Sequence, residues 1–108
     1  MKKVTQKQIT RAVHLLVRER QPEKIILFGS YARDMATQDS DVDLLVIVPE
    51  VKNKFREMIQ LRRVLRPLKI PVDVLVFSKK EVRDWGHLPG TVLYWALKEG
   101  KVLYERTN

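Results

Sequence analysis

The stretch KIILFGSYARDMATQDSDVDLLVIV, residues 24–48, decides the fold because it places two apolar runs on either side of a polar loop. The first run, Ile25 to Phe28, ends at Gly29, a pattern typical of a buried strand followed by a sharp turn. The second run, Val42 to Val48, is β-branched and aliphatic and is closed by Pro49, so it predicts a second strand. The polar residues at the ends of these strands are therefore the first candidates for chemistry.

Six further segments have the periodicity of helices or strands. We expect helices at residues 6–19, 52–66, 79–85 and 91–99, and strands at residues 70–77 and 101–105. A helical turn is also expected after Gly29, and Gly100 is expected to follow the last helix as a C′ glycine. The resulting order, α-β-α-β-α-β-α-α-β, predicts an α/β fold of the mixed α+β kind, with helices packed against a mixed sheet of about four strands.

Two groups of residues have the pattern of a packed face. The first repeats at helical spacing within residues 52–66 and comprises Phe55, Met58, Ile59, Arg62 and Leu65. The second lies near the C-terminus and comprises Trp85, Leu88, Tyr94 and Trp95. Core packing is the simplest expectation for the second group. The alternative is an interface, because aromatic residues are common interface anchors and a small domain cannot bury all of them deeply.

Length and composition fit one globular domain, residues 1–108. Hydrophobic residues make up 44% and charged residues 31%, which is ordinary for a folded protein and argues against disorder. The chain has no cysteine, which excludes disulfides and thiolate metal sites. No signal peptide is visible and the longest apolar stretch, Leu44 to Val48, is too short to span a membrane, so we expect a cytoplasmic protein.

The chain is basic, with 21 lysine and arginine residues, 13 acidic residues and a formal charge of +8. An anionic partner such as a nucleotide, RNA or an acidic protein face is compatible with this charge. A well-solvated basic surface explains the charge equally well. No RNA-binding motif is visible, so RNA stays open as a partner without being favoured.

Gly29 and Ser30 form the first candidate site. A glycine directly after a buried strand lets the backbone approach a ligand closely, and the amide groups that follow it favour an anion such as phosphate. An ordinary tight turn is the alternative, and on these two residues alone it is the simpler interpretation.

Asp41 and Asp43 form the second candidate site. Residues at positions i and i+2 of a strand project to the same face, so the two carboxylates repel each other at the edge of a core. A divalent cation would relieve this repulsion, because hard cations take carboxylate oxygens as ligands. The alternative is that Asp41 caps a turn and Asp43 faces the solvent.

Asp73 is the third candidate, because it interrupts the aliphatic run Val72 to Val76. Aspartate is disfavoured in strands and is rarely buried without a partner, so its charge requires compensation. If this strand lies beside the strand at residues 42–48, Asp73 joins Asp41 and Asp43 around one pair of cations. A buried salt bridge with an arginine or lysine is the competing interpretation.

The segments Gly29–Arg33 and Ser40–Leu44 together closely resemble the signature of the DNA polymerase β-like nucleotidyltransferase superfamily. The short chain suggests the minimal nucleotidyltransferase (MNT) branch of that superfamily. The resemblance covers the core from about Lys24 to Phe77, and Glu99–Glu105 also looks like the C-terminal segment of that branch.

The resemblance implies a role for each candidate. Gly29 and Ser30, with Arg33 and Ser40, would bind the nucleotide, whose expected form is ATP. Asp41, Asp43 and Asp73 would be the catalytic residues and the ligands of two Mg²⁺ ions, with Asp73 completing the site that activates the incoming hydroxyl. For Arg33, a structural ion pair is an equally good expectation.

Asp34 departs from the family pattern, which has a glycine after the arginine. Aspartate tolerates left-handed backbone better than most residues, so the turn is expected to survive. If its carboxylate pointed into the phosphate site, its negative charge would weaken nucleotide binding.

The resemblance also implies a partner. In the MNT branch, the transferase is an antitoxin that adenylylates a tyrosine of a helical toxin of the HEPN ribonuclease type, and we expect this reaction here. One alternative is a non-catalytic module that neutralises its partner by forming a complex. Another is a transferase that acts on RNA or on a small molecule. Self-association also stays open, because a small core and C-terminal aromatic residues favour an interface.

Overall fold

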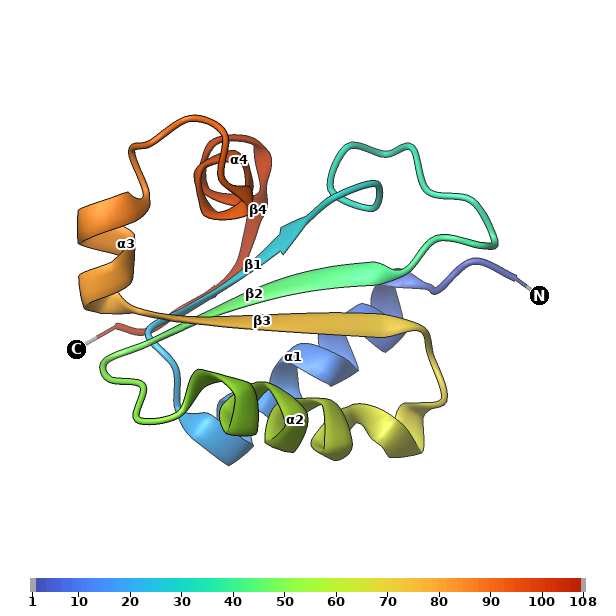
Figure 1. The fold of residues 1–108 in the computed structure, drawn as a ribbon. Coiled ribbons are helices and arrows are strands. Elements are labelled where there is room, and N and C mark those ends of the chain that lie inside the picture. Colours follow the sequence, from blue (N-terminus) through green and yellow to red (C-terminus); the bar gives the residue numbers. More distant parts are fainter. Residues whose placement is uncertain (1, 108) are drawn as a thin grey trace.

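The computed structural model describes residues 2–107 as a mixed sheet with helices on both faces (Figure 1). In chain order the elements are α1 (Gln6–Arg20), β1 (Lys24–Phe28), β2 (Val42–Val48), α2 (Lys54–Leu65), the 3₁₀ turn η1 (Arg66–Leu68), β3 (Val72–Ser78), α3 (Lys79–Trp85), α4 (Val92–Glu99) and β4 (Lys101–Glu105). The α/β fold expected from the sequence is thereby confirmed, with four strands in the order β3-β2-β1-β4. None of the helices in residues 2–107 combines the length and the apolar character needed to cross a membrane.

The pairing of the strands brings the predicted site residues together. β1 pairs antiparallel with both β2 and β4, whereas β2 and β3 are parallel. The strand that carries Asp73 therefore lies beside the strand that carries Asp43, which meets the condition set for their grouping.

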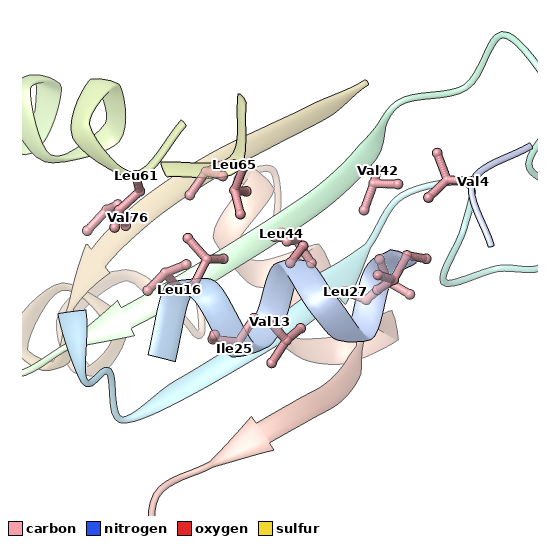
Figure 2. Close-up of a cluster of buried hydrophobic side chains, with 14 of the residues drawn as sticks. Val4, Val13, Leu16, Ile25, Leu27, Val42, Leu44, Leu61, Leu65 and Val76 are labelled. Carbon is pink, nitrogen blue, oxygen red and sulfur yellow. The ribbon is translucent and has the colours of Figure 1, made fainter. Parts of the chain in front are cut away.

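Helices α1 and α2 cover one face of the sheet and form the larger core with it (Figure 1). Figure 2 shows Val13 and Leu16 of α1 and Leu61 of α2 among the side chains of this core. α1 begins with a capping box, in which the Thr5 hydroxyl accepts from the Gln8 amide at 3.1 Å and the Gln8 side chain accepts from the Thr5 amide at 2.8 Å. This cap and the buried apolar stripe hold α1 under the strands that carry the site.

Helices α3 and α4 lie on the opposite face and cover less of it (Figure 1). Leu93 and Ala96 of α4 are buried against residues of β1 and β2, and Leu75 of β3 packs at the margin of this smaller cluster. Gly100 ends α4 as its C-cap in an extended conformation, so the expectation of a C′ glycine beyond the helix end was wrong. Space is the reason for this glycine, because a Cβ there would lie 2.4 Å from Cγ2 of Ile26.

The helical turn expected after Gly29 is present, because the Arg33 amide donates to the Gly29 carbonyl four residues earlier, and the segment does not continue as a helix. Two further expectations from the sequence were wrong. On α2, Leu61 and Leu65 face the core, while Phe55 is 73% exposed. Trp85 and Trp95 are 56% and 47% exposed, so neither is a core residue.

The outer edge of β3 is protected by two cations of α2. Arg62 donates to the carbonyl of Val74 at 3.4 Å, and the Lys54 ammonium donates to the carbonyl of Val76. Lys54 also forms an ion pair with Glu81 of α3 at 3.0 Å. Cations at an unpaired strand edge block the addition of another strand, so α2 links the edge of the sheet to α3.

Replacing Glu81 by alanine is expected to lower the free energy of unfolding by about 1 kcal/mol at pH 7, because it removes a capping box as well as the Lys54 ion pair. Burial alone would raise the pKa of Glu81, but hydrogen bonds from Ser78 and the charge of Lys54 outweigh it and lower that pKa. A carboxyl with a lowered pKa in the fold stabilises above its unfolded pKa and loses this contribution as the pH falls. Urea titrations of the Glu81→Ala variant should therefore show a difference from wild type that shrinks towards pH 3, and the exposed Glu19→Ala should show little effect at either pH.

Candidate functional site

The three aspartates lie at or just before the first residues of β2 and β3. Leu45 and Leu75 pack on the side of the sheet that α4 covers, and side chains two positions apart on a strand share a face. Asp43 and Asp73 therefore project to the α4 side as well. α3 lies over the other end of these strands (Figure 1), so the two carboxylates remain partly accessible.

The register of the sheet places Asp43 between one residue of β1 and one residue of β3. Its backbone pairs with Asp73 across the parallel β2–β3 ladder and with Phe28 across the antiparallel β1–β2 ladder. Phe28 immediately precedes Gly29, so the glycine turn and both aspartates lie at the same end of three adjacent strands.

Gly29 touches the carboxylate of Asp43. Its backbone has a φ of +73°, a left-handed conformation that side chains disfavour. A Cβ added at Gly29 would lie 2.3 Å from Oδ2 of Asp43, closer than two atoms can approach. Only glycine therefore lets the turn pass so close to the carboxylate, which sets the Gly29 turn and the Asp43 carboxylate side by side.

The backbone after Gly29 forms a compact turn with free amides. The amides of Ala32 and Arg33 donate to the Gly29 carbonyl at 3.1 and 3.2 Å. No hydrogen bond within residues 2–107 uses the amides of Ser30 or Tyr31. Unpaired amides at the start of a turn are suited to bind an anion, as expected for this segment.

Asp34 takes the left-handed conformation that the turn requires. Its φ is +59°, so the expectation that aspartate preserves the turn is confirmed. The residue lines a different hollow, together with Val4, Leu27 and Tyr31, and the Tyr31 hydroxyl accepts from the Val4 amide at 2.9 Å. The charge of Asp34 is therefore outside the group of aspartates.

The charges of the three aspartates interact at Asp43. Burial raises the pKa of the Asp43 carboxyl, and the negative charges of Asp73 and Asp41 raise it further. Asp41 itself is exposed and lies just before β2. Asp43 is therefore a partly buried carboxylate with an excess of negative charge around it, which favours a bound cation.

Asp73 has a partner of its own. Arg62 of α2 forms an ion pair with its carboxylate, and the two side chains are 42% and 46% exposed. The salt bridge considered as an alternative for Asp73 is thus present, although it is half-exposed where a buried one was expected. Within residues 2–107, no three His, Cys, Asp or Glu side chains converge closely enough to hold a metal ion.

The donor set nevertheless fits Mg²⁺ at Asp41 and Asp43. Both offer carboxylate oxygens, the ligands that Mg²⁺ prefers, and the Asp43 carboxylate lies beside the Gly29 turn with further negative charge around it. Asp73 would have to share its carboxylate between Arg62 and a metal ion. Its part in a metal site stays a prediction.

The remaining predicted residues lie nearby in different settings. The Ser40 hydroxyl accepts from the Thr37 amide at 2.9 Å, so it stabilises the loop that leads into β2. Arg33 is exposed and forms no ion pair within residues 2–107, so the structural pair expected as an alternative is not found there. The roles of both residues in nucleotide binding stay predictions.

Arg62 was missed as a site residue. The sequence signal was visible, because Arg62 falls between Met58 and Leu65 at the spacing of the packed face of α2. A cation in such a position requires a carboxylate or carbonyl partner, and Asp73 is that partner.

Replacing Asp43 by asparagine is expected to stabilise the metal-free protein by roughly 0.5–1 kcal/mol, because it removes one charge from a repulsive group at a functional site. Thermal unfolding at pH 7 in EDTA measures this gain, with the exposed Asp39→Asn variant as control. Adding Mg²⁺ should raise the midpoint of the wild type more than that of Asp43→Asn. A variant less stable than wild type in EDTA would contradict the repulsion.

Comparisons with known proteins concern the family and the fold. The model of a family described as nucleotidyltransferase domain matches residues 7–99. No curated protein sequence matches the chain significantly.

Solved structures share the fold. A crystal structure from Sulfolobus solfataricus assigned as a nucleotidyltransferase aligns with a TM-score of 0.66 and 22% identity, covering 93% of this chain and 79% of the other. A chain of a toxin–antitoxin complex with AMP-PNP aligns with a TM-score of 0.63 and 20% identity, covering 91% and 74%. A chain from the complex of a tri-AMPylated Shewanella oneidensis HEPN toxin with an MNT antitoxin aligns with a TM-score of 0.59 and 18% identity, covering 94% and 74%.

Proposed function

The chain belongs to the nucleotidyltransferase domain family, and on this basis we propose that it transfers AMP from ATP to a tyrosine hydroxyl of a HEPN-type partner. The contact between the Gly29 turn and the Asp43 carboxylate carries the proposal. This contact sets a candidate phosphate site beside a candidate cation site, and nucleotidyl transfer needs both sites at the α-phosphate.

The residues of the turn bind and orient the triphosphate. The free amides of Ser30 and Tyr31 donate to phosphate oxygens, and Arg33 supplies a positive charge from the same turn. Asp41 and Asp43, with Asp73 as the third acid, would hold Mg²⁺, which when bound neutralises charge on the attacking and leaving oxygens. The protein therefore contributes mainly position and charge.

The reaction is an in-line displacement at the α-phosphorus. The tyrosine oxygen forms a bond to the α-phosphorus while the bond from that atom to the bridging oxygen of the β-phosphate breaks, and pyrophosphate leaves. Asp73 accepts the proton of the attacking hydroxyl, and its ion pair with Arg62 keeps the carboxylate in place before the acceptor arrives. The products are pyrophosphate and a partner that carries AMP on its tyrosine.

The choice of a protein acceptor rests on two observations. The end of β2 and β3 that carries the aspartates is partly accessible, because α3 lies over the other end of these strands. Among the proteins of similar fold, one is in complex with a HEPN toxin that carries AMP groups. A partner that presents its own hydroxyl to the open end of β2 and β3 meets both observations.

Co-expression with the protein encoded next to this chain tests the proposal. An Asp41→Asn/Asp43→Asn variant should still co-purify with the neighbour but should no longer protect cells from it. Asp39→Asn should retain both properties. If the double variant still neutralises the neighbour, neutralisation comes from complex formation alone, and the catalytic proposal is wrong.

A further inference from the structure

A hollow lies between α4 and the Gly29 turn, and the proposed reaction does not use it. Phe28, Gly29, Arg33, Val92, Trp95, Ala96 and Glu99 line a cavity of about 180 Å³, here called the Trp95 hollow. Its size suits one aromatic ring system and excludes a whole nucleotide. Because Gly29 lines it, the hollow opens directly beside the proposed phosphate site.

The walls of the Trp95 hollow are mainly apolar, although they lie at the surface. Trp95 is 47% exposed and Val92 is 48% exposed, whereas Ala96 is buried. Exposed aromatic and aliphatic side chains that border a cavity are typical of a ligand site. A ligand site of this kind would account for the exposure of Trp95, which the sequence led us to expect in the core.

The orientation of Trp95 is constrained by its neighbours. Its ring packs edge-to-face with Tyr94, with centroids 5.1 Å apart and an angle of 88° between the ring planes. The Lys98 ammonium lies 5.8 Å from the centroid of the Trp95 ring. A held aromatic ring loses little entropy when a flat ligand stacks on it.

Polar groups border the same hollow. Neither Arg33 nor Glu99 takes part in an ion pair within residues 2–107, so both are available to a ligand. Arg33 can donate to phosphate or sugar oxygens, and the Glu99 carboxylate can accept from amino or hydroxyl groups. A ligand with a flat apolar body and polar edges matches this combination.

We propose that the Trp95 hollow binds the nucleobase of the substrate nucleotide, with the base stacked on Trp95. The inference rests on the proposed function, which places the triphosphate on the turn at Gly29. The hollow shares Gly29 and Arg33 with that turn, so a base that stacks on Trp95 can remain joined to phosphates bound at the turn. Stacking on an aromatic side chain tolerates different bases, so the hollow supplies affinity more than base selectivity.

Comparing ATP with inorganic tripolyphosphate separates the base from the phosphates. Isothermal titration with each ligand in the presence of Mg²⁺ should show that the wild type binds ATP more tightly. Trp95→Ala should weaken ATP binding by roughly 5- to 100-fold and leave tripolyphosphate binding unchanged. Trp95→Phe should recover most of the affinity for ATP, and Trp85→Ala, which alters the other exposed tryptophan, should match wild type.

Each outcome decides the inference. If wild type binds both ligands equally, or if Trp95→Ala binds ATP as wild type does, the hollow is not the base site, although the proposed function stands. If Trp95→Ala leaves ATP binding intact and weakens the complex with the neighbouring protein, the hollow is a protein contact. If neither ligand binds to the wild type, the proposed function fails and the inference fails with it.

Discussion

An Asp43→Asn variant is expected to transfer nucleotide roughly 10³-fold more slowly than wild type while remaining folded. Asp43 contacts Gly29 and faces Asp73, so its carboxylate is the centre of the proposed cation site. Asparagine keeps the shape of the side chain but loses the charge that attracts the cation. Initial rates at saturating ATP and Mg²⁺ measure the loss.

The same substitution is expected to stabilise the metal-free fold, so the loss of transfer activity cannot be attributed to unfolding. A variant that is more stable in EDTA and nearly inactive shows that Asp43 is retained for chemistry at a cost in stability. Asp39→Asn, in the exposed loop that leads to β2, should keep the wild-type rate. A fully active Asp43→Asn variant would contradict the assignment of the site.

A Gly29→Ala variant is expected to lose roughly 2–4 kcal/mol of unfolding free energy and to lose ATP binding. Two costs add at this position. The backbone has a φ of +73°, and the new Cβ would collide with Oδ2 of Asp43 at 2.3 Å. Relief of the collision requires the turn and the carboxylate to move apart, which separates the phosphate site from the cation site.

Gly90 provides a matched control for the backbone cost. Its φ is +93°, but a Cβ added there has no neighbour within 4 Å. Gly90→Ala should therefore cost only about 1–2 kcal/mol and leave ATP binding intact. If Gly29→Ala and Gly90→Ala lost the same unfolding free energy and bound ATP equally well, the contact between Gly29 and Asp43 would contribute to neither property.

The sequence indicated Asp43 and Asp73 because two simple rules act on it. Side chains alternate along a strand, and each of these aspartates interrupts an apolar run, so their charges require compensation from a neighbouring group. The structure places the two in register across β2 and β3. Gly29 was expected to let the backbone approach a ligand, and the structure shows that the residue it approaches within the fold is Asp43.

The surface features could not be predicted in the same way. Periodicity identifies an apolar face but does not say what covers it, so Phe55 and Trp95 were expected to pack and are exposed. The partner of Asp73 could not be predicted, because it is the side chain of α2 that reaches the edge of β3. Which side chain does so is decided by how α2 packs on the sheet. Gly100 was assigned a conformational role, whereas its contact with Ile26 comes from the tertiary packing of α4 on β1.

The central claim is that this chain moves AMP onto a protein, and transfer from ATP labelled at the α-phosphate tests it most directly. The purified chain is incubated with Mg²⁺ and the neighbouring protein, in parallel with Asp41→Asn and Asp39→Asn variants. We predict label on a tyrosine of the neighbour with the wild type and with Asp39→Asn, and none with Asp41→Asn. A stable complex in which no protein acquires label, with wild type and variants alike, would contradict the claim.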